Sequence, residues 1–173
     1  MRTLYLLRHG KAEPGAPGGR DFDRALAARG LRDSARVGAH LAERPDPPCW
    51  FLCSPARRAA QTLDRVLEAL PLGDDGEYQQ GLYLASAEQI FERVCEVDDA
   101  VESLLVVGHN PGLEQLAENL VRPPKSDPHA LVLPSFPTAA LATLRFDVDC
   151  WFDLAPRRGE LEFTTPKLLA ASR

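Results

Sequence analysis

The chain has 173 residues, 45% of them apolar and 26% charged, a composition typical of a globular protein that buries a core of its own. The net charge is −5, from 20 basic and 25 acidic residues, which argues against nucleic acid as the main partner. The apolar part of the N-terminus is too short for a signal peptide, and no run approaches the roughly 18 residues of a membrane span. We therefore expect a single domain over residues 1–173 and no membrane partner.

The cysteine pattern predicts free thiols. The four cysteines, Cys49, Cys53, Cys95 and Cys150, include no Cys-x-x-Cys pair. Cys49 and Cys53 lie in an expected strand, where about 3.3 Å per residue would separate their Cα atoms by roughly 13 Å, too far for a disulfide. No Cys and His residues cluster at zinc-ligand spacing. We expect buried thiols, no metal site and a reducing, cytoplasmic location.

The first third of the chain alternates strand and helix. Residues 3–7, TLYLL, form an apolar run with an aromatic residue and predict a buried parallel strand. Glycine and proline mark residues 11–23 as a loop, and apolar spacing then predicts an amphipathic helix from near Arg29 to before Pro45. Residues 50–53, WFLC, predict a second strand.

The rest of the chain continues the alternation. Ser54 and Pro55 predict the N-cap and first residue of a helix over residues 56–70. In chain order, the further expectations are a loop at 71–81, a short strand at 82–84, a helix at 86–97 opened by Ser86, a strand at 103–108, a loop and helix at 109–121, an irregular stretch at 122–138, strands within 139–147, 150–154 and 160–164, and a surface segment at 166–173.

This order of elements predicts an α/β fold. Strands that alternate with helices form a three-layer sandwich, with a mainly parallel central sheet and helices on both faces. In such sheets ligands bind at the carboxyl ends of the strands. The residues at those ends are therefore the candidates for function.

Three predicted strand ends carry similar chemistry. Arg8-His9-Gly10 follows the first strand, residues 54–62 (SPARRAAQT) follow the second, and residues 106–112 (VVGHNPG) span the end of the fourth. Together they supply two histidines, at least two arginines, helix N-terminal amides and a glycine that lets the backbone approach a ligand closely. Because the arginine fork matches phosphoryl oxygens, the combination predicts a phosphate pocket.

The two histidines suggest a chemical step at that pocket. A neutral imidazole is nucleophilic near pH 7, and its Nε2 can attack phosphorus when a backbone carbonyl fixes Nδ1–H. A second histidine beside the same phosphate would stabilise charge on its oxygens, either as a cation or as a hydrogen-bond donor. Arginines would take the place of a metal ion, so we expect no cofactor.

The three motifs in this order resemble the histidine phosphatase superfamily, whose hallmark is Arg-His-Gly after the first strand. Residues 21–30, DFDRALAARG, are similar to the Asp-x-x-Arg-x-Leu-x-x-x-Gly segment of its short, SixA-like branch of phosphohistidine phosphatases. The resemblance extends from residue 4 to about residue 165. It implies a phosphoglycerate mutase-like fold and a histidine phosphatase activity.

Carried to this sequence, the resemblance implies that His9 is the phosphorylated nucleophile and that Arg8 clamps the phosphate. The family's Arg-Ala-x-x-Thr register selects Arg58, so Arg57 should face elsewhere. His109 is implied as the second catalytic histidine.

Further residues are implied around the substrate. Gly10 allows close backbone approach, Arg24 reaches substrate or phosphate, and Asn110 offers a backbone N–H at a helix start. Larger family members use an acidic proton donor, for which Glu77 and Glu88 are the candidates here. We expect no strong general acid, because an imidazole leaving group needs less acid help than an alkoxide.

The expected function is hydrolysis of phosphohistidine, carried on a protein, with inorganic phosphate as product. A small phosphate-bearing substrate of a phosphomonoesterase or mutase is the alternative within enzymes. A mutase would need a lid and an acid, and neither is evident in the sequence. A phosphate-binding module without activity is the alternative from another class.

Overall fold

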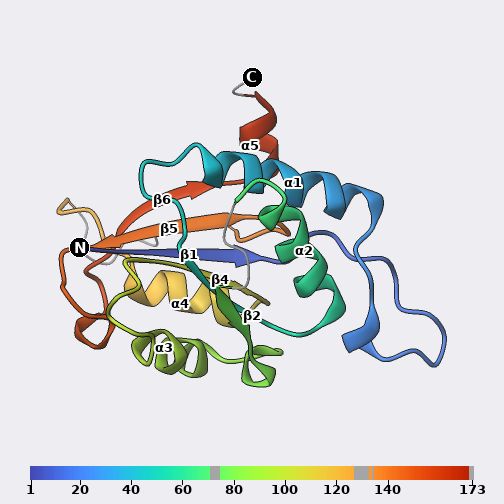
Figure 1. Ribbon diagram of the computed structural model, residues 1–173, viewed down its shortest axis with the longest axis horizontal. Helices are drawn as coiled ribbons and strands as arrows, with labels where there is room; N and C mark the ends of the chain where they lie inside the picture. The colour runs from blue at the N-terminus through green and yellow to red at the C-terminus, as the bar shows by residue number, and fades with distance from the viewer. Residues whose placement is uncertain (71–74, 127–132, 134, 172–173) are drawn as a thin grey trace.

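The structure, a computed structural model, describes residues 1–70, 75–126, 133 and 135–171. Its centre is a six-stranded sheet in the order β3-β2-β4-β1-β5-β6 (Figure 1). The strands are β1 Arg2–Arg8, β2 Trp50–Cys53, β3 Gly76–Tyr78, β4 Ser103–Gly108, β5 Leu141–Phe146 and β6 Glu160–Thr164. The first four are mutually parallel, and β5 and β6 join antiparallel, so the sheet is mainly parallel as predicted.

Helices cover both faces of this sheet, which confirms the three-layer architecture. They are α1 Ala28–Ala42, α2 Arg57–Leu67, α3 Ala87–Cys95, α4 Gly112–Leu120 and α5 Pro166–Ala171, with short 3-10 turns η1 Asp21–Asp23, η2 Gln80–Leu82 and η3 Trp151–Asp153. In Figure 1 α1 lies above the sheet, and α3 and α4 lie below it. Helix α2 packs on the same core as α1, the one that contains Tyr5 and Leu7.

Alternation along β1 divides the core in two. Leu4 and Leu6 point to the face covered by α3 and α4, whereas Tyr5 and Leu7 point to the face covered by α1 and α2. All four side chains are fully buried, as expected for a central strand that is covered on both sides. The central strands therefore hold the residues that follow them in fixed positions.

Three predicted segments differ from the structure. Residues 76–78 form the edge strand β3 inside the expected loop, where only three residues pair with β2. The expected strand at 82–84 is wrong: its start belongs to η2, and Leu84 has a positive φ of 53°, which a strand does not accept. The expected strand at 150–154 is also wrong. Residues 151–153 form the 3-10 turn η3, in which Trp151 is buried and the next residue, Phe152, is 81% exposed.

The start of α2 is also corrected. Ser54 and Pro55 do not open the helix, because Ala56 takes the N-cap position and the helix runs from Arg57 to Leu67 rather than to residue 70. The Ser54 hydroxyl accepts the Ala56 N–H at 3.4 Å and faces the strand ends instead. By contrast, Ser86 caps α3 as predicted, in a capping box with Gln89.

The cysteines are free, as predicted, but only Cys53 is buried. Cys49 is exposed, and Cys95 and Cys150 are half-buried, so the expectation of four buried thiols is wrong. Within the described ranges, none of the helices has the length and apolar character that crossing a bilayer requires.

Candidate active site

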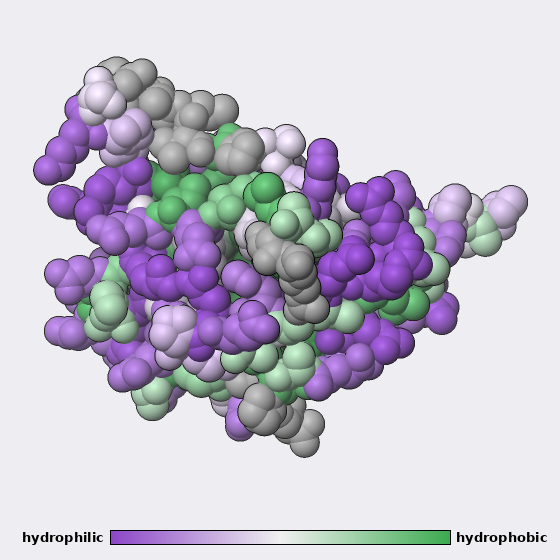
Figure 2. Space-filling model, turned by 90° about the horizontal axis from the view of Figure 1, so that it is seen from above, coloured by the Kyte–Doolittle hydropathy of each residue, from purple (hydrophilic) through white to green (hydrophobic). Residues whose placement is uncertain are grey.

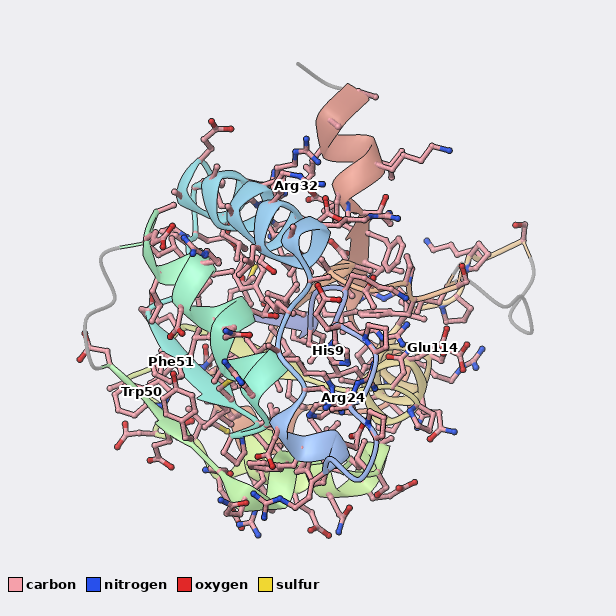
Figure 3. All side chains as sticks on the ribbon, turned by 90° about the vertical axis from the view of Figure 1, so that its right-hand side faces the viewer. His9, Arg24, Arg32, Trp50, Phe51 and Glu114 are labelled. Carbon is pink, nitrogen blue, oxygen red and sulfur yellow. The ribbon has the colours of Figure 1, made fainter. Side chains whose placement is uncertain are left out.

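The carboxyl ends of three parallel strands bring the predicted residues together. Arg8 at the end of β1 pairs with Gly108 at the end of β4, and the His9 N–H donates to the Gly108 carbonyl oxygen at 3.1 Å. The Ser54 N–H, just after β2, donates to the Val107 carbonyl oxygen at 3.0 Å. The rings of His9 and His109 consequently lie with centroids 5.1 Å apart. Figure 3 views the molecule from this end, with His9 near its centre.

Two hydrogen bonds define the tautomer of His9. Its Nδ1 lies 2.8 Å from the Gly10 carbonyl oxygen, an acceptor, so Nδ1 carries the proton. Its Nε2 lies 3.2 Å from Nε–H of Arg58, a permanent donor, so Nε2 carries the lone pair. The imidazole is thereby fixed with its nucleophilic nitrogen toward a guanidinium.

Arg58 lies in the first turn of α2 and is only 4% exposed. Besides the His9 ring, it donates from Nη1 to the Asp21 carbonyl oxygen at 2.7 Å and from Nη2 to the Asp21 carboxylate at 2.9 Å. Its guanidinium carbon lies 6.0 Å from the centroid of the Tyr83 ring. The neighbouring Arg57 is exposed, as the sequence predicts.

Thr62, one turn after Arg58, fixes the loop that carries His9. Its hydroxyl accepts the Gly10 N–H at 2.9 Å and donates to the Arg58 carbonyl oxygen at 2.7 Å. A side chain at Gly10 would meet Ser34 Oγ at 2.8 Å and the Gly30 carbonyl oxygen at 2.9 Å. Gly10 is therefore required for close contact between this loop and α1, while its predicted contact with substrate stays a prediction.

His109 is buried, at 2% exposed, and follows β4. Its Nε2 lies 2.7 Å from Ser54 Oγ, and its buried Nδ1 has no partner among the described residues. The Tyr83 ring meets it edge-on at a centroid distance of 5.6 Å. One nitrogen of His109 is thus held by Ser54, and the other is buried without a partner among the described residues.

Burial keeps both histidines neutral. Desolvation, with the nearby Arg58 and Arg8 guanidinium groups, lowers the pKa of His9 to about 4, although the bond to the Gly10 carbonyl opposes this. Desolvation, followed by the charge of His9 and of Arg58, lowers the pKa of His109 to about 3. Near pH 7 the free site therefore holds a neutral imidazole pair.

Arg8 and Asn110 are linked through one carbonyl group. Nη1 of Arg8 donates to the Phe136 carbonyl oxygen at 2.7 Å, and Nδ2 of Asn110 donates to the same oxygen at 3.0 Å. Asn110 also donates to the Glu114 carboxylate at 3.1 Å, whose other oxygen accepts the Phe136 N–H at 2.9 Å. Burial lowers the pKa of Arg8, although Glu114 opposes this. The described bonds of Asn110 are made by its side chain, whereas the sequence suggested its backbone N–H.

Asp21 connects Arg24 to the site. Nη1 of Arg24 pairs with the Asp21 carboxylate at 2.9 Å, and its Nε donates to the Glu13 carbonyl oxygen at 3.0 Å. The other Asp21 oxygen accepts both Arg58 Nη2 and, at 2.9 Å, the Tyr83 hydroxyl. The hydrogen bond from Arg24, supported by those from Tyr83 and Arg58, lowers the pKa of Asp21 to about 2. Asp21 is therefore an anion that joins two arginines.

Sequence reasoning gave no role to several residues of this site. They are Asp21, Ser54, Thr62, Tyr83 and Glu114. Asp21 and Thr62 occupy fixed positions of the two quoted motifs, Asp-x-x-Arg-x-Leu-x-x-x-Gly and Arg-Ala-x-x-Thr, and this spacing was the available signal. Tyr83 and Glu114 carry no comparable local signal, because packing between distant segments positions them.

The two candidate acids lie elsewhere. Glu77, on β3, accepts a bond from Gln79 at 2.9 Å and lines a groove with Trp50. Glu88 is exposed in the first turn of α3. Within the described part of the chain, neither forms a hydrogen bond or ion pair with the two histidines or with Arg58. Among the described residues, no three His, Cys, Asp or Glu side chains are grouped so that they could hold a metal ion.

The fold and these strand ends define a phosphatase of the histidine type. The model of the histidine phosphatase superfamily (branch 1) matches residues 4–81. The uncharacterized protein Rv1276c of Mycobacterium tuberculosis is 35% identical over 153 residues, which cover 87% of this chain and 92% of that protein. The chain belongs to the histidine phosphatase superfamily.

Solved structures assign it to the SixA-like branch. A SixA protein from Nakamurella multipartitia is 30% identical, with a TM-score of 0.81 and coverage of 95% of this chain and 96% of the other. A SixA protein from Agrobacterium tumefaciens is 33% identical, with a TM-score of 0.79 and coverage of 95% and 98%. The protein histidine phosphatase SixA complexed with tungstate is 25% identical, with a TM-score of 0.77 and coverage of 96% and 99%. The predicted phosphoglycerate mutase-like fold and SixA-like resemblance are thus confirmed.

Proposed function

We propose that this phosphatase hydrolyses protein-borne phosphohistidine through a phosphoenzyme at His9. The observation that carries the proposal is the fixed His9 imidazole, with Nδ1–H bonded to the Gly10 carbonyl and the Nε2 lone pair beside Arg58. A neutral imidazole held in this tautomer is ready to attack phosphorus.

In the first step the Nε2 lone pair of His9 forms a bond to phosphorus. The phosphorus–nitrogen bond of the substrate breaks, and its electron pair returns to the substrate imidazole, which leaves neutral when its other nitrogen carries a proton. Water then attacks the phosphorus on His9, and the electron pair of the broken bond returns to Nε2. The products are a free histidine side chain and dihydrogen phosphate, which loses a proton to bulk water.

Cations and hydrogen-bond donors of this chain stabilise the negative charge on the phosphoryl oxygens during transfer. Arg8 and Arg58 are the clamps for the phosphoryl oxygens, and the free nitrogen of His109 is a further bonding position. Asp21, the carboxylate that pairs with Arg58, has a pKa of about 2 and is a poor proton donor. This favours a substrate whose leaving group needs little protonation, which an imidazole satisfies and an alkoxide does not.

Two observations favour a substrate carried on a protein. Asp21 and Arg24, which join the site through Arg58, are partly exposed, so solvent reaches this edge of the site. Similar solved structures are SixA proteins, one of them called a protein histidine phosphatase and complexed with the tetrahedral oxyanion tungstate.

Trapping of the phosphoenzyme tests the proposal. A brief reaction with radiolabelled phosphohistidine peptide, quenched in alkali, should leave an acid-labile phosphate on His9. The His9→Ala variant should carry no label and lose activity by at least about 10⁴-fold, because it lacks the nucleophile. Activity that survives this change would exclude the mechanism.

Substrate comparison separates the alternatives. Phosphoramidate should be hydrolysed much faster than an alkyl phosphate, with no change on addition of a chelator. Equal or faster turnover of alkyl phosphates would favour a phosphomonoesterase. Binding of phosphate without any turnover would favour a silent binding module.

A further inference from the structure

A second cationic region lies on α1, outside the proposed catalytic pocket. A groove of about 320 Å³ runs between α1 and α5, lined by Arg29, Arg32, Asp33, Arg36, Pro166, Lys167 and Ala170. Four cations and one carboxylate give this groove a formal charge of 4 − 1 = +3, on a chain whose net charge is −5. Figure 2, seen from above, shows hydrophilic surface over this side of the molecule.

The cations of the groove are only partly neutralised. Asp33 is 5% exposed and pairs with Arg29 at 3.2 Å and with Arg36 at 3.1 Å. Arg32 and Lys167 are exposed and form no ion pair with any described residue. The buried carboxylate thus holds two guanidinium groups in place, and two further cations remain available to a partner.

The groove adjoins the proposed catalytic loop. A side chain at Gly30 would overlap the carbonyl oxygen of Lys11, two residues after His9, so the first turn of α1 lies directly against this loop. Arg29 and Arg32, one residue before and two residues after Gly30, lie in the same part of α1. In Figure 3 Arg32 lies at α1, above His9 in the view.

We propose that this groove, the α1–α5 groove, binds an acidic segment of the phosphorylated protein substrate. The inference rests on the proposed function, in which phosphohistidine reaches the pocket on a protein. Separated cations beside an active site speed the encounter with a partner of opposite charge and fix its orientation. The acidic balance of the whole chain disfavours nucleic acid as the occupant.

Two matched peptides test the groove. One carries phosphohistidine flanked by glutamates, and the other has each glutamate replaced by glutamine. At low salt the wild-type protein should hydrolyse the acidic peptide with a kcat/KM about tenfold higher, and added salt should abolish the difference. The double variant Arg32→Glu, Lys167→Glu should lose this preference but keep its turnover of phosphoramidate.

A control and a direct binding measurement complete the test. Arg65→Glu, at an exposed arginine of α2 that pairs with Glu68, should keep the preference. An unphosphorylated acidic peptide with a fluorescent label should bind the wild type at low salt, and the double variant should bind it about tenfold more weakly.

The outcomes separate the two proposals. Equal rates and equal binding for both peptides would overturn the proposal that the α1–α5 groove binds an acidic segment. Turnover of phosphoramidate would still leave the proposed function intact. Absence of phosphohistidine turnover would reject the proposed function and, with it, a groove that serves this substrate. Tighter binding of a single-stranded oligonucleotide than of the acidic peptide, lost in the double variant, would assign the groove to nucleic acid instead.

Discussion

Two regions at the same sheet differ in the charges they hold. One is a groove of about 550 Å³ between β2, β3 and α3, lined by residues that include Trp50, Glu77, Arg93, Glu96 and Asp98. Its one cation, Arg93, is paired with Glu96 at 2.6 Å, and its carboxylates would repel a phosphate. The strand ends around His9 instead gather Arg8, Arg24 and Arg58.

Convergent cationic charge, rather than the size of a groove, distinguishes the strand ends around His9 from the groove between β2, β3 and α3. Carboxylates occur near both regions, but they have different partners. Asp21 is bound by two arginines and a tyrosine, so its charge positions cations, whereas Glu77 accepts a bond only from the neutral Gln79 among its described contacts. Variants that change one region and spare the other test this contrast.

The largest expected effect after loss of His9 comes from Arg58. Arg58→Ala should lower kcat/KM for phosphoramidate by about 10³-fold, because it removes a clamp and the donor that faces His9 Nε2. The matched change Arg57→Ala, at the exposed neighbour, should stay within about twofold. Steady-state kinetics at several pH values measures both. Similar losses in the two variants would mean that the selected register is wrong.

A smaller effect is expected at Asp21. Asp21→Asn should lower kcat/KM by about 10- to 100-fold, because the side chain that pairs with Arg24 and Arg58 loses its negative charge while the His9 imidazole remains. Tyr83→Phe should cost only a few-fold, since it removes one hydroxyl bond to Asp21. Asp21→Glu should restore part of the activity, as expected for a positioning residue. A shift of the acid limb of the pH profile in Asp21→Asn would instead indicate that Asp21 exchanges protons in the reaction.

The pH dependence follows from the lowered pKa values of the histidines. Because burial lowers the pKa of His9 to about 4, kcat/KM should change little between pH 7 and 5 and fall only near pH 4. The free energy of unfolding should also decrease as the pH is lowered. The unfolded chain binds protons near pH 6.5, whereas the folded histidines resist them down to pH 3–4, so the free energy of unfolding falls as pH drops from about 6.5 to 4.

Denaturant titrations at several pH values measure that slope, which is at most about 1.4 kcal/mol per pH unit for each histidine. His9→Gln should have a shallower slope than the wild type. An activity limb near pH 6.5 would show that the buried pair titrates like exposed histidines.

The smallest effect is expected in the groove lined by Trp50 and Glu77. Glu77→Gln should change kcat/KM by less than about twofold, because Glu77 contacts neither histidine in the described structure. The same kinetic assay, with an alkyl phosphate as second substrate, measures it. A loss of 100-fold or more confined to the alkyl phosphate would identify Glu77 as a general acid. The groove lined by Glu77 would then take part in the reaction, and the contrast with the region around His9 would disappear.

Local sequence signals predicted much of the fold and of the candidate site. The apolar runs of β1 and β4 and the apolar spacing of α1 and α2 are properties of neighbouring residues, so they are readable without a structure. Arg8 ends β1, His9 and His109 directly follow β1 and β4, and Arg58 lies in the first turn of α2. Parallel strands place their carboxyl ends at one edge of the sheet. Their convergence was therefore predictable.

The sequence by itself thus determined the architecture and the edge of the sheet that carries the polar residues. Tertiary structure alone decided that Asp21 reaches Arg58, that Tyr83 borders His109 and that Ser54 bonds a histidine rather than capping a helix. It also decided that residues 76–78 pair at the sheet edge while residues 82–84 do not. The physical reason is that these contacts join segments far apart in the chain, where packing geometry outweighs the weak preferences of short local stretches.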